Sequence, residues 1–466
     1  MKRREFVKTL GGCAAALAVT DCARRKDKPD SSPPNIILIV TDDQRHDAVG
    51  CAGNPIIHTP VMDNLAARGI RFEHAFVTTP ICAASRASIF TGLYERAHGY
   101  TFTKPPLSST LMDSSYPAIL RQSGYHTGFV GKFGIEVEDG VIGAMFDRFH
   151  STAYPYFQEV DGKKRHLTDI HGDLALAFLR KRPHNQPFCL SLSFWAPHAD
   201  DGSTQQYFWP DVCSEMYRDV VIPPPPTSEP EFFEALPDFL KNSLNRVRWF
   251  WRFDTPEKYQ AMVKGYYRMI SGIDRVIGRL REELVRQSIE HNTIIILISD
   301  NGYFLGERGF AGKWLMHEPS IRVPLIIYDP RIPQEFVGRI ITKPALNLDL
   351  APSLLDLASL PVPKKMQGRS LAPLMRDRNQ PFRTEVFCEH LWDHPQIPQT
   401  EGIRTDGWKY IRYIKHPEYE EVYNLTDDPN ESQNLASDPG QSLRLQNLRQ
   451  RCRELADSAR HQGKEK

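Results

Sequence analysis

Two continuous runs of mostly apolar residues dominate the hydrophobic pattern of the chain. They cover residues 35–40 and 293–298. Because neither run alternates with polar residues, each predicts a strand buried on both faces, as in a parallel sheet covered by helices. Shortly before the second run, over residues 259–287, apolar side chains recur at spacings of three and four, which predicts a long amphipathic helix packed on the sheet. The pattern indicates an α/β fold.

Oxygen-bearing side chains follow both predicted strands. Asp42 and Asp43 come after the first, and Asp300 and Asn301 after the second. Because ligands of open α/β sheets bind beyond the carboxyl ends of the strands, we expect these four side chains at one edge. Hard oxygen donors suit Ca²⁺ or Mg²⁺. Either pair alone fits a helix N-cap or a turn equally well, so the prediction of a metal site depends on both pairs together.

The charge and cysteine content narrow the class of protein. The chain has 466 residues, with 58 Lys and Arg against 57 Asp and Glu, a formal net charge of +1. This balance argues against binding of nucleic acid through bulk phosphate neutralisation and gives no general attraction to anionic membranes. Eight cysteines without a CxxC or zinc-binding spacing are too few for a disulfide scaffold. The composition favours a large globular enzyme.

Residues 1–33 are expected to be an export signal and linker. Residues 2–8 resemble the twin-arginine export motif, and the apolar run after them is too short to cross a bilayer. A frayed tail is the alternative. We expect an exported protein, periplasmic or at the cell surface of a bacterium. Its one expected membrane attachment is a lipid anchor at Cys22, although Asp21 before it fits that processing poorly.

A cysteine stands at the start of a predicted short helix. Helix-forming residues follow Cys82, and Gly92 provides a stop signal. A group at the first turn of a helix faces unpaired N–H donors and the positive end of the helix dipole, which stabilise negative charge. Arg86, one turn later, can point back to the same place. A small buried core cysteine is the alternative interpretation.

The segment Cys82-Ala-Ala-Ser85-Arg86, followed by Thr91-Gly92, resembles the signature of the sulfatase family. In that family the cysteine is converted to formylglycine, whose hydrated aldehyde is the nucleophile. Ala84 replaces the usual proline, as in some members of the family. The resemblance covers most of the chain after the signal; the other matching segments are 34–44, 131–132, 194–198, 299–302, 312–325, 403–410 and 421–429.

The resemblance implies an alkaline phosphatase-like architecture. A mostly parallel central sheet sandwiched by helices is expected over residues 34–360, with a smaller C-terminal α+β subdomain over 361–466. It also implies a formylglycine maturase as a partner and a Ca²⁺ cofactor, with Mg²⁺ as the alternative. The implied metal ligands are Asp42, Asp43, the formylglycine formed from Cys82, Asp300 and Asn301.

The family's catalytic groups map onto four further residues. Arg86 matches the residue that holds the hydrated aldehyde, and Lys132 and Lys313 match the lysines that neutralise sulfate oxygens. His198 matches the histidine that protonates the leaving oxygen, a usual task for a histidine near its reference pKa of about 6.5. Taken without the resemblance, the lysines read as ordinary surface residues and His198 as the end of a strand.

The sequence departs from the family pattern at three places. Gly134, Arg308 and His317 stand where many relatives carry histidine, histidine and tyrosine. One histidine that assists the hydrated aldehyde is thus expected to be missing, and Arg308 or His317 is a candidate to reach a substrate carboxylate instead. The excursion over 201–254 carries a run of four consecutive prolines, 223–226, and an aromatic group, Trp249 to Phe253, which fits either sugar stacking or a satellite hydrophobic cluster.

The leading hypothesis is a sulfuric ester hydrolase acting on a sulfated carbohydrate, either a glycan or a glycosaminoglycan. One alternative is a phosphonate or phosphodiester hydrolase with the same fold and formylglycine. The other is an inactive, glycan-binding relative, against which the full set of implied site residues argues. The sequence does not distinguish endo from exo action or give the position of the sulfate.

Overall fold

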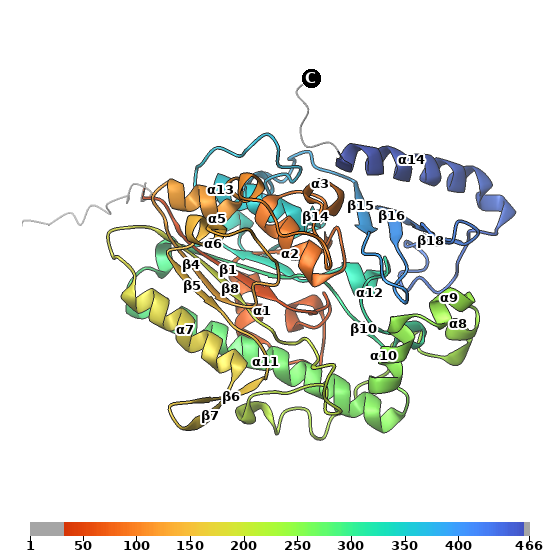
Figure 1. Ribbon diagram of the computed structural model, residues 1–466, viewed down its shortest axis with the longest axis horizontal. Helices are drawn as coiled ribbons and strands as arrows, with labels where there is room; N and C mark the ends of the chain where they lie inside the picture. The colour runs from red at the N-terminus through yellow and green to blue at the C-terminus, as the bar shows by residue number, and fades with distance from the viewer. Residues whose placement is uncertain (1–31, 461–466) are drawn as a thin grey trace, which may run out of the picture. The chain divides into compact units, whose positions relative to one another are not determined.

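A computed structural model describes residues 32–460 of the chain. Residues from Pro33 onward form one compact unit built on an eight-stranded sheet (Figure 1). In spatial order the strands are β13 (Arg339–Ile341), β2 (Ile70–Phe72), β12 (Leu325–Tyr328), β9 (Thr293–Ser299), β1 (Asn35–Thr41), β8 (Phe188–Ser193), β4 (His126–Gly131) and β5 (Arg148–Ser151). Only β12 runs antiparallel to its neighbours, so the mostly parallel sheet is confirmed.

The two apolar runs of the sequence are the adjacent central strands β1 and β9. They pair in parallel, with Thr41 opposite Ser299. Consecutive residues of β1 enter opposite cores: Ile36 and Leu38 belong to one hydrophobic cluster, and Ile37 and Ile39 to the other. This explains why the run is continuous rather than alternating, since both faces of the sheet are covered.

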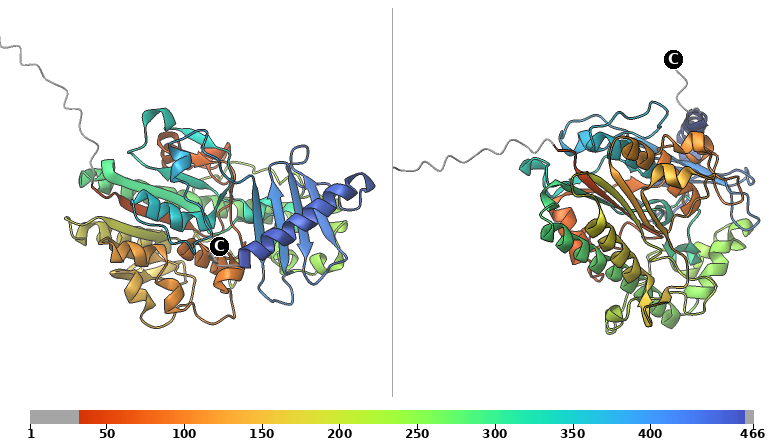
Figure 2. Two further views of the ribbon diagram at one scale, coloured as in Figure 1. Left: turned by 90° about the horizontal axis from the view of Figure 1, so that it is seen from above. Right: turned by 60° about the vertical axis from the view of Figure 1, so that its left-hand side comes forward.

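Helices cover both faces of the sheet (Figures 1 and 2). The cluster containing Ile37 also holds apolar side chains of α7 (Leu167–Lys181) and α11 (Pro256–Arg286). The opposite cluster holds side chains of α2 (Cys82–Thr91), α5 (Tyr116–Gln122) and α13 (Leu350–Leu357). Further helices before the C-terminal sheet are α1 (Pro60–Arg68), α3 (Glu95–His98), α4 (Ser109–Met112), α6 (Val141–Met145) and α12 (Glu318–Ile321).

The predicted amphipathic helix is α11, which begins three residues earlier than its apolar pattern indicated. Pro256 occupies its first turn, and the hydroxyl of the N-cap residue Thr255 accepts a hydrogen bond from the Lys258 N–H. Pro is favoured at this place because its missing N–H would have no helical partner. The capping chemistry thus extends the helix beyond its apolar face.

The C-terminal part is a four-stranded antiparallel sheet with one long helix. Its strands are β15 (Glu385–His390), β16 (Thr400–Thr405), β17 (Trp408–Tyr413) and β18 (Glu420–Asn424), in that order. Figure 2 shows α14 (Ser442–Arg460) lying across this sheet, and Leu445, Leu448 and Cys452 share its hydrophobic cluster. Two-stranded pairs complete the fold: β3 (Ala75–Phe76) with β14 (Ala345–Leu346), β6 (Phe157–Val160) with β7 (Lys163–His166), and β10 (Phe304–Leu305) with β11 (Ala311–Gly312).

The excursion over 201–254 is folded rather than a long structureless loop. It contains α8 (Pro230–Glu234), α9 (Asp238–Lys241) and α10 (Leu244–Arg252). Within its aromatic group the Arg246 guanidinium lies 3.9 Å from the centre of the Trp249 ring and 4.5 Å from that of Phe250. This cation–π packing favours the structural interpretation of the aromatic residues, although Phe250 and Trp251 remain partly exposed.

The predicted export motif and the anchor at Cys22 lie outside the described residues. Between residues 32 and 460, no helix is long and apolar enough to cross a membrane. The six cysteines of this part, at positions 51, 82, 189, 213, 388 and 452, are free thiols.

Candidate active site

The four predicted oxygen-bearing residues meet at the carboxyl edge of β1 and β9. The Asp43 N–H donates to Asp300 Oδ1 at 3.2 Å, and the Asn301 amide donates to Asp43 Oδ1. Asp43 has a left-handed backbone, φ 68°. Such strain in a non-glycine residue persists only where surrounding contacts fix it, and it concentrates at functional sites. The parallel register of the two strands therefore assembles the site that the sequence predicted.

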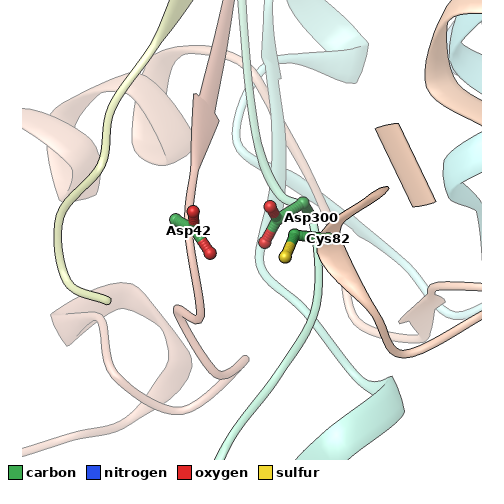
Figure 3. Close-up of side chains that lie close together, drawn as sticks. All are labelled: Asp42, Cys82 and Asp300. Carbon is green, nitrogen blue, oxygen red and sulfur yellow. The ribbon is translucent and has the colours of Figure 1, made fainter. Parts of the chain in front are cut away.

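Helix α2 delivers Cys82 to this edge. The residue begins the helix, is 6% exposed, and its Sγ lies 3.8 Å from Lys313 Nζ. One ligand atom each from Asp42, Cys82 and Asp300 lie within 4.8 Å of one another (Figure 3). Gly92 ends the helix in a left-handed conformation, as its position in the sequence predicted.

Three buried cations surround the carboxylates. Arg86 Nε donates to Asp300 Oδ2 at 2.8 Å, and its Nη1 donates to the Lys132 carbonyl at 2.7 Å. Lys132, directly after β4, pairs with Asp42, and Lys313, directly after β11, pairs with Asp43. Burial alone would lower the pKa of both lysines, but the neighbouring carboxylates raise it above the ordinary value. Both side chains are therefore charged at neutral pH.

The pKa values of Asp300 and Asp42 are shifted in opposite directions because the surroundings of the two carboxylates differ. Burial raises the pKa of Asp300 to about 6, and the negative charge of Asp42 adds to this effect. Asp42 is buried as well, but Lys132 and the other cations hold its pKa well below the usual range. Charge balance within the cluster, rather than solvent, thus determines which groups are ionised.

His198 faces the same cluster from the loop after β8. Its Nε2 lies 3.6 Å from Asp43 Oδ2, and one ligand atom each of Asp42, Asp43 and His198 fall within 4.8 Å of one another. Burial lowers the pKa of His198 to about 4, against the opposing pull of Asp43. All nine residues predicted from the sequence are therefore gathered in one place.

The oxygens of this cluster fit a hard divalent cation. Among the residues from 32 to 460, Asp42 Oδ1, Asp43 Oδ2 and Asn301 Oδ1 are buried without a hydrogen-bond partner. Buried oxygens normally have a partner, because leaving one unpaired costs about 1–3 kcal/mol. Carboxylate and amide oxygens are the ligands that Ca²⁺ and Mg²⁺ prefer. A cation bound here would satisfy all three atoms.

Some contributing residues carried no signal in the sequence. Ser193 Oγ accepts from Arg86 Nη1 at 2.5 Å, and Asn347 Nδ2 donates to Ser85 Oγ at 2.9 Å and so anchors α2. Each is a single polar residue whose role depends on a partner more than 100 positions away. No local spacing would have singled them out.

Arg308 and His317 are each paired with residues of the C-terminal part, which favours a structural role over contact with a substrate. Arg308 is 5% exposed, donates to the Glu431 carbonyl and lies 5.5 Å from the centre of the Tyr423 ring. His317 Nε2 lies 2.9 Å from Glu421 Oε2. Both residues line a cavity of about 460 Å³ whose lining does not include Cys82. The backbone at Arg308 is left-handed, φ 56°, and the side chain contacts Glu431 and Tyr423 of the C-terminal part.

Arg86 fills the space beside Gly134, so a histidine side chain would not fit at this position. It has φ +72°, and a Cβ at this position would lie 2.7 Å from Arg86 Cδ. A side chain here would therefore displace the arginine that holds Asp300.

The sheet topology and this cluster define an alkaline phosphatase-like hydrolase. A sequence model of the family described as "Sulfatase" matches residues 34–360, so the chain belongs to the sulfatase family, and it is a sulfatase enzyme. A second family model, "N-sulphoglucosamine sulphohydrolase, C-terminal", matches residues 306–458.

Characterised relatives resemble the chain over most of its length. An N-acetylglucosamine-6-O-sulfatase of Bacteroides thetaiotaomicron is 28% identical, covering 90% of this chain and 86% of its own. An arylsulfatase of Clostridium perfringens is 28% identical, covering 89% and 93%. A solved structure in complex with its substrate, D-glucosamine-2-N,6-O-disulfate, has a TM-score of 0.79 and 25% identity, covering 92% and 98%. The phosphonate monoester hydrolase of Agrobacterium radiobacter, with a TM-score of 0.72 and 20% identity, covering 91% and 96%, shares the fold.

Proposed function

We propose that this protein hydrolyses a sulfate ester on a carbohydrate. The nucleophile is the formylglycine formed from Cys82. A divalent cation, with Ca²⁺ as the first candidate, binds next to this side chain. The observation that carries the proposal is the set of unpartnered buried oxygens on Asp42, Asp43 and Asn301, next to Cys82 at the start of a helix. This arrangement combines a place for a hard cation with a place for developing negative charge.

The charge of the site supports an anionic substrate. Arg86, Lys132 and Lys313 balance the carboxylates of Asp42, Asp43 and Asp300. A divalent cation on the free oxygens would make the pocket positive, although the net charge of the whole chain is only +1. Attraction for a sulfate group would therefore be local rather than a property of the whole surface.

The cation would be held by Asp42, Asp43, Asp300 and Asn301 and would supply positive charge against the sulfate oxygens. The converted side chain of Cys82 would supply one hydroxyl to attack sulfur and a second through which sulfate is released. Arg86 fixes the position of Asp300, and Lys132 and Lys313 bind sulfate oxygens. His198 Nε2 gives a proton to the bridging oxygen as it leaves.

The relatives support a carbohydrate as the leaving group. The Bacteroides thetaiotaomicron relative is an N-acetylglucosamine-6-O-sulfatase, and the solved protein holds a sulfated glucosamine. The likeness to a phosphonate monoester hydrolase concerns the fold alone. A phosphodiester is therefore the comparison substrate in the test.

The test uses protein co-expressed with a formylglycine maturase. Mass spectrometry of the peptide that contains Cys82 reports the conversion, and turnover is compared between sulfated monosaccharides and a phosphodiester in the presence of Ca²⁺. We expect conversion and faster turnover of the sulfate ester, both lost in Cys82→Ala and both kept in Cys388→Ala, a control that removes another buried thiol. An unmodified, inactive protein, or faster turnover of the phosphodiester, would overturn the proposal.

We also propose that the protein is exported through its twin-arginine-like segment and that Cys22 anchors it to lipid. Replacing Arg3 and Arg4 together by lysine should keep the protein in the cytoplasm of the producing cell. Cys22→Ala should convert a membrane-bound fraction into a free one. Unchanged fractionation in either variant would contradict the corresponding part.

A further inference from the structure

Tyr154, in the connection between β5 and β6, contacts the imidazole of His198. Its hydroxyl oxygen lies 2.9 Å from His198 Nδ1 and 3.4 Å from the Ala199 carbonyl oxygen. That carbonyl in turn lies 2.6 Å from His198 Nδ1. Three polar groups therefore meet on the side of the imidazole that faces away from Asp43.

This triangle determines which ring nitrogen of His198 carries a proton in the neutral form. A carbonyl oxygen only accepts hydrogen bonds, so the group facing it at 2.6 Å must be Nδ1–H. The Tyr154 oxygen accepts from the same Nδ1–H and donates its own hydrogen to the Ala199 carbonyl. Nε2 is left with its lone pair directed toward the cluster, 3.6 Å from Asp43 Oδ2. Hydrogen bonding at one ring nitrogen commonly fixes the other in this way.

Neighbouring aromatic residues hold Tyr154 in place. Its ring centre lies 4.4 Å from that of Trp195 and 5.1 Å from that of Tyr156. The Tyr156 hydroxyl donates to the His198 carbonyl at 2.5 Å, and Trp195 Nε1 donates to the Thr152 carbonyl at 2.9 Å. The β5–β6 connection is thus tied at several points to the loop that carries His198.

The same aromatic group reaches the sulfate-binding cations. Lys132 Nζ lies 4.6 Å from the centre of the Trp195 ring.

Burial raises the pKa of Tyr154, so its hydroxyl is neutral and acts only through hydrogen bonds.

We propose that Tyr154 is a positioning residue for the proton transfer to the leaving group: it holds the proton of His198 on Nδ1 and directs Nε2 at the bridging oxygen. This inference rests on the proposed role of His198 in sulfate-ester hydrolysis. During turnover the bond between sulfur and the bridging oxygen breaks, and its electron pair stays on that oxygen. The attacking hydroxyl gives its proton to Nε2 of His198 as it bonds to sulfur, and the bridging oxygen takes that proton from Nε2–H and leaves as an alcohol. His198 returns to the neutral form with its remaining proton on Nδ1.

The test compares two sulfate esters in Tyr154→Phe. A 4-nitrophenyl sulfate has a leaving group that is stable as an anion and needs little protonation, whereas an alkyl or sugar sulfate must be protonated as it leaves. We expect kcat on the sugar sulfate to fall by about tenfold, the cost of one lost hydrogen bond, with KM unchanged. On 4-nitrophenyl sulfate kcat should change by less than about twofold. The ratio of the two rates does not depend on the amount of folded enzyme, so a lowered yield leaves the result readable.

Two further variants sharpen the test. His198→Ala should itself slow the sugar sulfate more than 4-nitrophenyl sulfate, and adding Tyr154→Phe to it should cause no further loss on the sugar sulfate. Tyr116→Phe is the matched control, because it removes another fully buried hydroxyl, one bonded to Ser191 Oγ at 2.6 Å. It should leave the ratio of the two rates unchanged.

The possible outcomes distinguish a failure of the proposed role of Tyr154 from a failure of the proposed sulfatase function. A wild-type protein that cleaves neither ester would contradict the proposed function. A wild-type protein that cleaves both, with Tyr154→Phe lowering both rates equally or not at all, would overturn the role of Tyr154 alone. Additive losses in the double variant would also overturn it, because Tyr154 would then act independently of His198.

Discussion

Arg86 and Asp300 form an ion pair that joins helix α2 to the segment directly after strand β9, with Nε and Oδ2 2.8 Å apart. Both side chains are almost fully buried, at 3% and 0% exposure. The guanidinium also donates to the Lys132 carbonyl and to Ser193, so one side chain ties three segments together. The planar, multiply donating group is what this geometry requires.

Replacing Arg86 by lysine should therefore lower activity even though the charge is kept. A lysine presents a single ammonium group, which cannot reach Asp300, the Lys132 carbonyl and Ser193 together. We expect kcat on a sulfate ester to fall on the order of 100-fold, as for loss of one fixed electrostatic group in an active site. Arg96→Lys, which alters a buried arginine paired with Glu389 and Glu401, should lower the melting temperature but not kcat per folded enzyme. Equal activity of Arg86→Lys and wild type would contradict this role.

Removal of divalent cations should destabilise the folded protein as well as abolish activity. The free oxygens of Asp42, Asp43 and Asn301 would then be buried without partners. Adding Ca²⁺ at 100 times its dissociation constant should restore about 2.7 kcal/mol of stability. Thermal melting after chelation, with Ca²⁺ and Mg²⁺ titrated separately, measures this and ranks the two ions. The shift should largely disappear in Asp43→Asn, and an equal shift in that variant would place the cation elsewhere.

Gly134→Ala should impair the site through Arg86. A Cβ at this position would lie 2.7 Å from Arg86 Cδ, and the φ of +72° adds backbone strain of about 1 kcal/mol. Gly124→Ala is a matched control, since it has φ +91° with nothing within 4 Å of a Cβ. Both variants should lose similar stability from the backbone, but only Gly134→Ala should lose kcat by tenfold or more, measured on an activated aryl sulfate. Equal kcat in the two variants would mean that Arg86 can move aside without consequence.

Arg308→Ala should lower stability without changing substrate binding. The variant loses the hydrogen bond to the Glu431 carbonyl and the contact with the Tyr423 ring, a cost of about 1–3 kcal/mol for a buried charged donor. KM should stay the same for uronate-containing and neutral sulfated sugars. Urea unfolding and steady-state kinetics check the two halves. A KM that rises for uronate substrates alone, with stability intact, would restore the substrate role that the sequence first indicated.

The sequence predicted those structural features that a local pattern of residues determines. The strands that end just before Asp42 and Asp300 follow from continuous apolar runs, and the helix starting at Cys82 follows from its composition and Gly92. The direction of Arg308 depends instead on one left-handed backbone angle and on Glu431, 123 positions away. Tyr154 was missed for the same reason, because its partner, 44 positions later, is brought near only by the fold.

The last prediction concerns the pH dependence of stability at Asp274, in α11 and remote from Cys82. Its carboxylate accepts from the N–H groups of Val61 and Met62 at 3.1 and 2.7 Å, in the first turn of α1. Burial nevertheless raises the pKa of Asp274 to about 6 from 3.8. The folded state therefore holds this proton more tightly than the unfolded chain, and the stability this gives is lost as the pH rises through 4 to 6.

Asp274→Asn should remove that dependence, because an amide does not titrate. The unfolding free energy of the wild type relative to the variant should fall by about 2 kcal/mol between pH 4 and pH 6 and stay level above pH 7. Urea unfolding of both proteins at a series of pH values measures the difference, in which groups common to both cancel. A difference that rises over this interval would show that the N–H donors of α1 outweigh burial and hold the carboxylate ionised.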